Sequence, residues 1–183
     1  MKKLFLILFI TLMVFGCGEQ KKKENATKPA LKTLVQKIAE AEKNINPNEP
    51  IDRTIALNLA NMYQHFADSL PKDIKAPIYL LKASDYYSSV NMHSQKCHIY
   101  RNIIENYPNF KDVDMVQYLY ASSLDSDFDE RAEAKKQYQI YLDKYPNSTY
   151  VNDAKSRLES IDKLSFKELQ EKIIKGELNT SNK

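Results

Sequence analysis

The 183-residue chain has no tryptophan, two cysteines and three glycines, Gly16, Gly18 and Gly176. Residues 19–175 therefore contain no glycine. Tight hairpin turns between strands need residues such as glycine at positive φ, so a sheet built of short hairpins is not expected. Loops that cradle phosphates need glycine where the backbone approaches the ligand, which excludes mononucleotide and dinucleotide sites of that kind.

The chain also lacks a large excess of either charge, because it has 27 basic and 24 acidic residues and a formal net charge of +3. Such a balance does not match the basic footprint of a nucleic-acid-binding protein. What the chain does have is a hydrophobic content of 43% and 12 tyrosines. A packed core is therefore expected rather than a disordered chain.

The N-terminus reads as an export signal. Lys2 and Lys3 precede a mostly apolar run over residues 4–15, and Gly16 and Cys17 follow. A membrane-spanning helix needs about 20 apolar residues, so this run is too short to be one. A basic start, a short apolar middle and a small residue predict a signal peptide over residues 1–16.

The Cys directly after Gly16 resembles the lipobox of bacterial lipoproteins, which implies that Cys17 carries lipid. The alternative is an ordinary secreted protein with an incidental cysteine at that place. Residues 17–29 are polar and are interpreted as a flexible tether. If Cys17 is lipidated, Cys97 has no partner for an internal disulfide. The residue after Cys17 is not Asp, which favours the outer membrane over the inner membrane. The expected location is the periplasmic face of the outer membrane, with the inner membrane or the cell surface as alternatives.

An internal repeat follows the tether. Tyr63, Tyr100 and Tyr138 each stand eight residues before a proline, at positions 71, 108 and 146. Apolar residues recur three, four and seven positions after each tyrosine, which is the buried stripe of an α-helix. Proline cannot donate the next backbone hydrogen bond, so each helix is expected to end there.

The pattern predicts an all-α protein. Asp52, Asn91, Asp112 and Asp129 are interpreted as N-caps, Ser165 with Glu168 as a capping box, and Gly176 as the last helix end. Residues 177–183 are expected to be disordered. The eight expected helices cover residues 30–44, 53–70, 77–90, 92–107, 113–124, 130–145, 149–162 and 165–176.

The repeat resembles the tetratricopeptide repeat. Ala83 and Ala121 match the small residue at which paired helices touch, and Tyr86 and Leu124 match the large residue one turn later. Lys96 stands where the matching position of the next repeat has a small residue. The resemblance implies a right-handed superhelix of about eight antiparallel-paired helices over residues 30–176, in which neighbouring pairs bury one another's apolar faces.

The segment Tyr145-Pro-Asn-Ser148, followed by Asp153 and Ala154, is similar to repeats of bacterial envelope lipoproteins. Among these are the lipoprotein subunit of the outer-membrane β-barrel assembly machine and periplasmic coordinators of envelope constriction. The resemblance implies a scaffold or adaptor that binds envelope proteins, with no enzymatic activity, cofactor, nucleic acid or small-molecule substrate. Outer-membrane protein assembly is the expected role, and cell-wall or division processes are the alternative.

In that family, the first helix of each pair lines a binding groove. Carried over from Ala83 and Ala121, the expected partner-binding groove positions are Leu80, Ser84, Tyr87, Tyr118, Ser122 and Asp125. Tyrosine and hydroxyl groups would anchor a protein segment there. The alternative is that Leu80 and Tyr118 pack between repeats.

His93, Cys97 and His98 suggest a metal or small-ligand carrier as a further alternative. His93 and Cys97 are four residues apart and share a helix face. Cys97 also continues a buried stripe with Tyr100 and Ile104, and a free cysteine packs like a small hydrophobic residue. A metal site needs one or two more ligands, so no metal site is predicted. No strand-turn elbow for a nucleophile is present either.

Overall fold

The computed structural model describes residues 32–46 and 48–175. The signal peptide, Cys17, the whole tether and the C-terminal tail lie outside these residues, as does Gly176. The chain divides into two compact units, residues 1–51 and 52–183. In the described part of the first unit, residues 32–43 form a helix, which agrees with the helix expected over residues 30–44.

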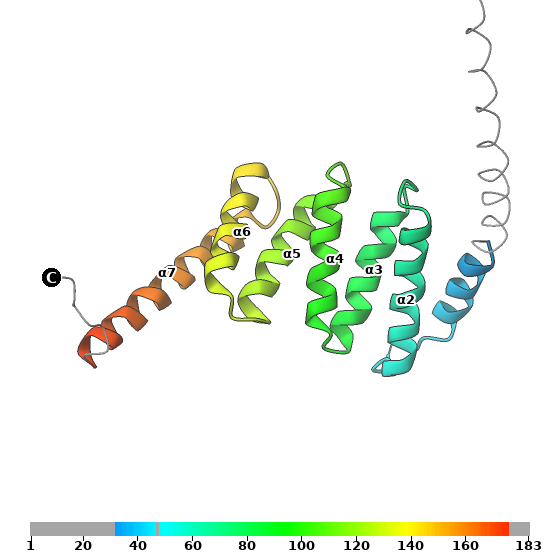
Figure 1. Cartoon of the computed structure of the whole chain (residues 1–183), viewed down its shortest axis with the longest axis horizontal. Coiled ribbons are helices and arrows are strands. Elements are labelled where there is room, and N and C mark those ends of the chain that lie inside the picture. The colour runs from blue at the N-terminus through cyan, green and yellow to red at the C-terminus, as the bar shows by residue number, and fades with distance from the viewer. Residues whose placement is uncertain (1–31, 47, 176–183) are drawn as a thin grey trace, which may run out of the picture. The chain divides into compact units, whose positions relative to one another are not determined.

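The described part of the second unit is all-helical, as predicted, and contains no strand. Successive helices pack against one another in chain order. The turns alternate between the two ends of the row, so neighbouring helices run antiparallel (Figure 1). The six helices of this part are α2 (Arg53–Ser69), α3 (Ala76–Ser89), α4 (His93–Asn106), α5 (Val113–Ser126), α6 (Arg131–Lys144) and α7 (Val151–Ile174).

The three proline turns have one geometry, which confirms the repeat seen in the sequence. Leu70, Tyr107 and Tyr145 end α2, α4 and α6 with φ between −129° and −132°. Each donates its backbone N–H over 2.9 Å to the carbonyl oxygen four residues earlier. The proline that follows lacks an N–H and stops the helix at the same point each time.

Spacing between equivalent elements is 37 and then 38 residues. Helices α3, α5 and α7 begin at positions 76, 113 and 151, and α2, α4 and α6 end at 69, 106 and 144. The extra residue falls in the turn between α5 and α6. The residue of α3 that is equivalent to Ala121 is therefore Ser84. The sequence alignment used a period of 38 and matched Ala83 with Ala121, which is one residue out of register.

The tight turns after α3 and α5 also differ from expectation. Asn91 and Asp129 have φ of 61° and 55°, in the left-handed region, and neither is an N-cap. The caps of α4 and α6 are Met92 and Glu130, without side-chain hydrogen bonds. Asn and Asp tolerate positive φ better than other non-glycine residues, so here they replace glycine in reversing the chain.

Capping predictions held at Asp52, whose side chain accepts hydrogen bonds from the N–H groups of Thr54 and Ile55. Helix α5 does begin directly after Asp112, although that side chain makes no capping bond.

The expected pair of C-terminal helices, residues 149–162 and 165–176, is wrong. A single helix, α7, runs unbroken through Ser165 over 24 residues. No glycine or proline lies between residues 151 and 174, so nothing in this segment opposes helix continuation, and the capping-box pattern is overridden. The expected fourth pair of helices is therefore absent from the described residues.

Candidate interface on helices α3, α5 and α7

The six expected groove residues divide into two groups. Leu80, Ser84, Tyr87 and Tyr118 are buried, with at most 7% of each residue exposed. Ser122 and Asp125 are partly exposed. Leu80 and Tyr118 therefore pack between helices, as the alternative interpretation stated, and the accessible surface lies beside them.

Tyr87 is held from α2. Its hydroxyl lies 3.0 Å from Asn61 Oδ1 and 3.2 Å from Gln64 Oε1. Burial, followed by the nearby Asp68 carboxylate, raises the pKa of Tyr87. The ring thus ties α3 to α2 and is not free to anchor a partner.

Tyr118 joins α5 to α7 in the same way. Its hydroxyl donates to Asp153, and its ring stacks on Tyr150 at 4.6 Å between centroids. Asp153 also accepts from Arg157 Nε at 2.8 Å, and the Arg157 guanidinium lies 3.8 Å from Asp125. Hydrogen bonds from Tyr118 and Arg157 lower the pKa of Asp153, so this carboxylate stays ionised.

Tyr138 has an unsatisfied hydroxyl in the middle of this cluster. The residue is fully buried, and its oxygen has no hydrogen-bond partner among the described residues. Burial raises its pKa to about 12. A buried hydroxyl without a partner is costly, so it is a local weakness of the cluster through which α6 packs against α5 and α7.

One surface remains open on the first helix of each pair. We call it the α3/α5 face. At the 37-residue spacing, Ile78 and Asp85 of α3 correspond to Met115 and Ser122 of α5, so the two helices present the same side. All its members are partly or fully exposed, and they are Ile78, Leu81, Asp85, Met115, Ser122 and Asp125.

The α3/α5 face carries two carboxylates. Asp125 lies 3.8 Å from the Arg157 guanidinium of α7, and burial raises the pKa of Asp85. Helix α5 contains no lysine or arginine. The single basic residue of α3 is Lys82, whose ammonium points to α2 and lies 3.4 Å from the Tyr63 hydroxyl. The face therefore combines apolar side chains and a serine hydroxyl with two carboxylates.

Sequence reasoning missed the residues that organise this surface, chiefly Asp85, Asp153 and Arg157. The spacing of Asp153 and Arg157, four residues apart on one helix face, is a signal that could have found their ion pair. The register in which Asp85 of α3 corresponds to Ser122 of α5 came only from the helix boundaries.

The metal or carrier alternative gains no support from the geometry. His93 Nδ1 lies 3.3 Å from Asp127 Oδ1, and its ring contacts Phe128 edge-on. His98 is exposed, whereas Cys97 is buried, so they lie on different sides of α4. Within residues 32–46 and 48–175, no group of three or more His, Cys, Asp or Glu residues could hold a metal ion. Burial raises the pKa of Cys97, so its thiol is protonated and unreactive at neutral pH.

An open depression of about 410 Å³ lies between the start of α5 and the turn after α6. Inside it, Asp114 accepts a hydrogen bond of 2.6 Å from Ser148 Oγ, which accepts one of 2.7 Å from the Tyr141 hydroxyl. These bonds hold the turn after α6 in place, so we interpret the depression as a consequence of how this turn packs and not as a ligand site. Its lining residues are Lys111, Val113, Asp114, Lys144, Tyr145, Pro146, Asn147 and Ser148.

Comparisons with protein-family models, with curated proteins and with solved structures find no match. None of the helices in the described parts of the chain has the length and apolar character needed to cross a membrane.

Proposed function

We propose that this protein is a membrane-anchored lipoprotein whose tetratricopeptide-type repeats form a scaffold that binds a segment of another protein on the α3/α5 face. The observation that carries the proposal is that this face is accessible to solvent, whereas the other sides of α3 and α5 contain the buried residues of these helices. The regular spacing of 37 and 38 residues supports the right-handed superhelix that such repeats form.

The composition of the face suits a protein segment better than a small molecule. Ile78, Leu81 and Met115 offer apolar contact, whereas Asp85 and Asp125 favour basic or donor groups on the partner. Rows of adaptable contacts of this kind on an exposed helix face bind extended segments or helices.

The cellular setting of the proposal rests on sequence. A signal peptide over residues 1–16, lipid on Cys17 and a polar tether place the repeat domain at the periplasmic side of the outer membrane. Two or more acyl chains are needed for stable anchoring, which the lipoprotein pathway supplies. Outer-membrane protein assembly is the proposed role, with cell-wall or division processes as the alternative.

The test is a crosslinked pull-down from membranes with the lipidated full chain, followed by mass spectrometry. The test variant is Ile78→Lys with Asp85→Lys, on the α3/α5 face. The control is Asp68→Lys with Gln139→Lys, exposed positions on α2 and α6 that change the net charge by the same amount. We expect the test variant to lose its partner, because basic groups now face it, and the control to retain it.

Each outcome has a defined meaning. Recovery of the central barrel-assembly protein in a face-dependent manner supports the assembly role. Face-dependent recovery of cell-wall or division proteins keeps the scaffold and moves it to the alternative process. Equal recovery with both variants, or recovery of no partner, refutes binding through the α3/α5 face.

A further inference from the structure

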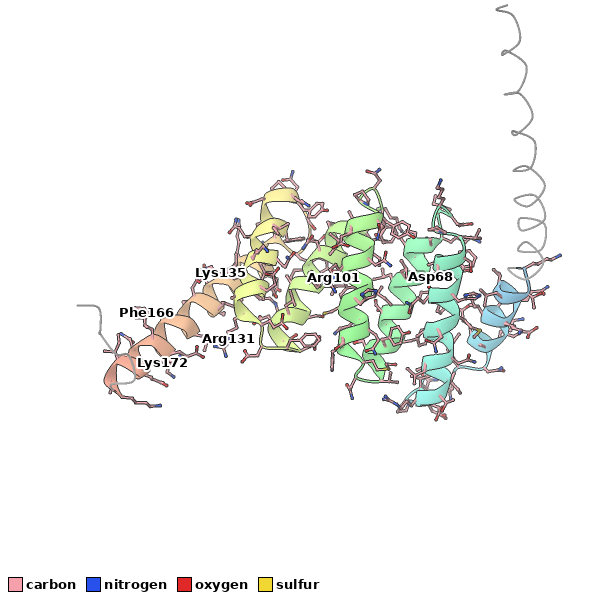
Figure 2. The ribbon with its side chains drawn as sticks, in the orientation of Figure 1. Asp68, Arg101, Arg131, Lys135, Phe166 and Lys172 are labelled. Atoms are coloured by element: carbon pink, nitrogen blue, oxygen red, sulfur yellow. The ribbon has the colours of Figure 1, made fainter. Side chains whose placement is uncertain are left out.

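The C-terminal half of α7 carries an apolar stripe that nothing in the described chain covers. Phe166, Leu169 and Ile173 are 62%, 47% and 60% exposed. Their spacing of three and four residues places them on one side of the helix. We call these three residues the α7 stripe. Phe166 lies on the part of α7 that projects past α6 (Figure 2).

The first half of α7 behaves differently. At the positions where α5 has Gln117, Ala121 and Leu124, spacing of 38 residues gives Lys155, Glu159 and Asp162. In α5 these residues are buried, whereas in α7 they are exposed. Polar residues at these positions are what the end of a helical stack requires. Within the described residues, the first half of α7 therefore has the polar outer side of a terminal helix, and the α7 stripe lies beyond this half.

Lysines surround the α7 stripe. On a helix of 100° per residue, Lys163 and Lys172 flank it on opposite sides, and Lys167 and Lys175 follow further round. Lys163 lies 3.6 Å from Glu159, so most of the unneutralised basic charge comes from the other three. Of the two glutamates in this segment, Glu168 is paired with Arg131 of α6. Two copies of the α7 stripe packed on each other would bring flanking lysines together, which disfavours pairing of like with like.

The α3/α5 face has the complementary chemistry. Its exposed or partly exposed apolar residues are Ile78, Leu81 and Met115, and α5 has no basic residue. Asp85 offers an exposed carboxylate to a basic partner, whereas Asp125 lies 3.8 Å from the Arg157 guanidinium of α7. The α7 stripe cannot reach the α3/α5 face of its own chain, because α7 is one continuous helix whose first half is fixed against α6 by Ala154 and Ile161. Only another copy can bring the two surfaces together.

We infer that the α7 stripe of one copy docks on the α3/α5 face of a second copy. The contact joins two different surfaces, so it leaves a free stripe at one end and a free face at the other, and further copies can add. Three apolar side chains make a small interface, and anchoring on one membrane would raise the local concentration that a weak contact needs. The inference depends on the face named in the proposed function, and it makes a second copy a competitor for the partner segment.

The test is site-specific photocrosslinking in cells that co-express two full-length chains with different tags. The first chain carries a benzophenone amino acid at position 166. The matched control carries it at position 171, which is exposed on the opposite side of α7. We expect position 166 to give a product that contains both tags, with the crosslink mapped to α3 or α5. Position 171 should give little of it.

Substitutions in the second chain then identify the receiving surface. Asp85→Lys in that chain should reduce the product at least about fivefold, because a lysine then meets the lysines of α7. Asp68→Lys, on exposed α2 surface, is the charge-matched control and should change it little. A complementation experiment uses two altered chains. The first carries the crosslinker and Asp85→Lys, so it keeps its stripe and loses its face. The second carries Leu169→Ser and Ile173→Ser, so it keeps its face and loses its stripe. The product between a first and a second chain should persist, whereas the product between two first chains should disappear.

The inference is overturned if position 166 gives no copy–copy product, or products with lipid or another protein alone. It is also overturned if Asp85→Lys and Asp68→Lys have equal effects. These results are separable from failure of the proposed function: if the Ile78→Lys and Asp85→Lys double variant still loses a heterologous partner in the pull-down, the scaffold stands and only the self-docking falls.

Discussion

Two helix junctions occupy equivalent places in the repeat and are built from different chemistry. Lys96 of α4 and Ala134 of α6 are 38 residues apart and both are buried. Lys96 Nζ lies 2.7 Å from Asp127 Oδ2 at the end of α5. Ala134 instead packs in an apolar cluster with residues such as Tyr138, Tyr141 and Ala154.

The difference shows that the repeat constrains helix spacing and not the residue that fills the contact. A lysine is tolerated at the α4–α5 junction because its long stem reaches a carboxylate at the edge of α5, where 16% of the Asp127 side chain is still exposed. At the α6–α7 junction, aromatic rings occupy the space, and only a methyl group fits. A buried ion pair is weak evidence for stability, so the apolar junction is expected to be the stronger one.

The largest expected effect comes from exchanging the chemistry of one junction for that of the other. Ala134→Lys places an ammonium in an apolar cluster with Tyr138 and Tyr141, and adds volume to a packed site. We expect a loss of about 4 kcal/mol or more in the free energy of unfolding. Urea denaturation followed by circular dichroism measures it, and a loss under about 1 kcal/mol would show that the two junctions are interchangeable.

Breaking the ion pair from one side should cost nearly as much. Asp127→Asn leaves Lys96 buried without a counter-charge, which typically costs about 3–5 kcal/mol. Adding Lys96→Met to that variant should recover most of the loss, because the unpaired charge is then gone. A double-mutant cycle from urea denaturation measures the coupling. If the double variant is as unstable as Asp127→Asn alone, then the junction does not depend on the pair.

Removing single hydroxyls should separate satisfied from unsatisfied groups at the apolar junction. Tyr141→Phe removes a hydroxyl that bonds Ser148 at 2.7 Å, and we expect a loss of about 1 kcal/mol. Tyr138→Phe removes a buried hydroxyl that has no partner among the described residues, so stability should be unchanged or slightly higher. Thermal unfolding of the two variants measures both effects. A larger loss of stability for Tyr138→Phe than for Tyr141→Phe would contradict the assignment of the Tyr138 hydroxyl as the unsatisfied one.

The smallest effect is a pH dependence confined to the charged junction. Burial acts to raise the pKa of Asp127, but the Lys96 ammonium and the Ser123 hydroxyl outweigh it, so the pKa lies below its ordinary value. The unfolded chain then binds more protons than the folded one. The contribution of the pair is therefore present above about pH 4 and is lost as pH falls through the folded-state pKa.

Denaturation midpoints measured from about pH 5 downward check this prediction, since the loss begins as pH approaches the unfolded-state pKa of Asp, about 3.9. The control is the variant with both Lys96→Met and Asp127→Asn, which should lose less stability on acidification than the natural chain. If the double variant and the natural chain lose the same stability on acidification, the pH dependence comes from other carboxylates, such as Asp153.

Much of the helical framework was predictable because its signals are local. The tyrosine–proline spacing predicted the ends of α2, α4 and α6 to within one residue, and Asp52 was identified as a cap. The predicted break at Ser165 failed because a capping pattern is permissive: it stabilises a helix start where the chain already turns, and nothing near Ser165 makes it turn.

The candidate site was less predictable. Leu80, Ser84, Tyr87 and Tyr118 were expected to line a groove, with packing between repeats as the alternative for Leu80 and Tyr118. All four are buried. Tyr87 bonds to residues 23 and 26 positions earlier, and Tyr118 to one 35 positions later. No pattern within one helix reports such a contact. A one-residue insertion in the turn after α5 also shifted the register by which Ala83 and Ala121 were aligned.

By itself the sequence determined that the chain is helical, where most helices end and that they recur at a fixed spacing, since backbone hydrogen bonding and proline act within a few residues. Only the tertiary structure decided which tyrosines are buried, that Lys96 has Asp127 as its partner and that the α7 stripe is left uncovered. Burial and charge pairing depend on side chains brought together from about one repeat away, and their cost or benefit is realised only when the helices pack.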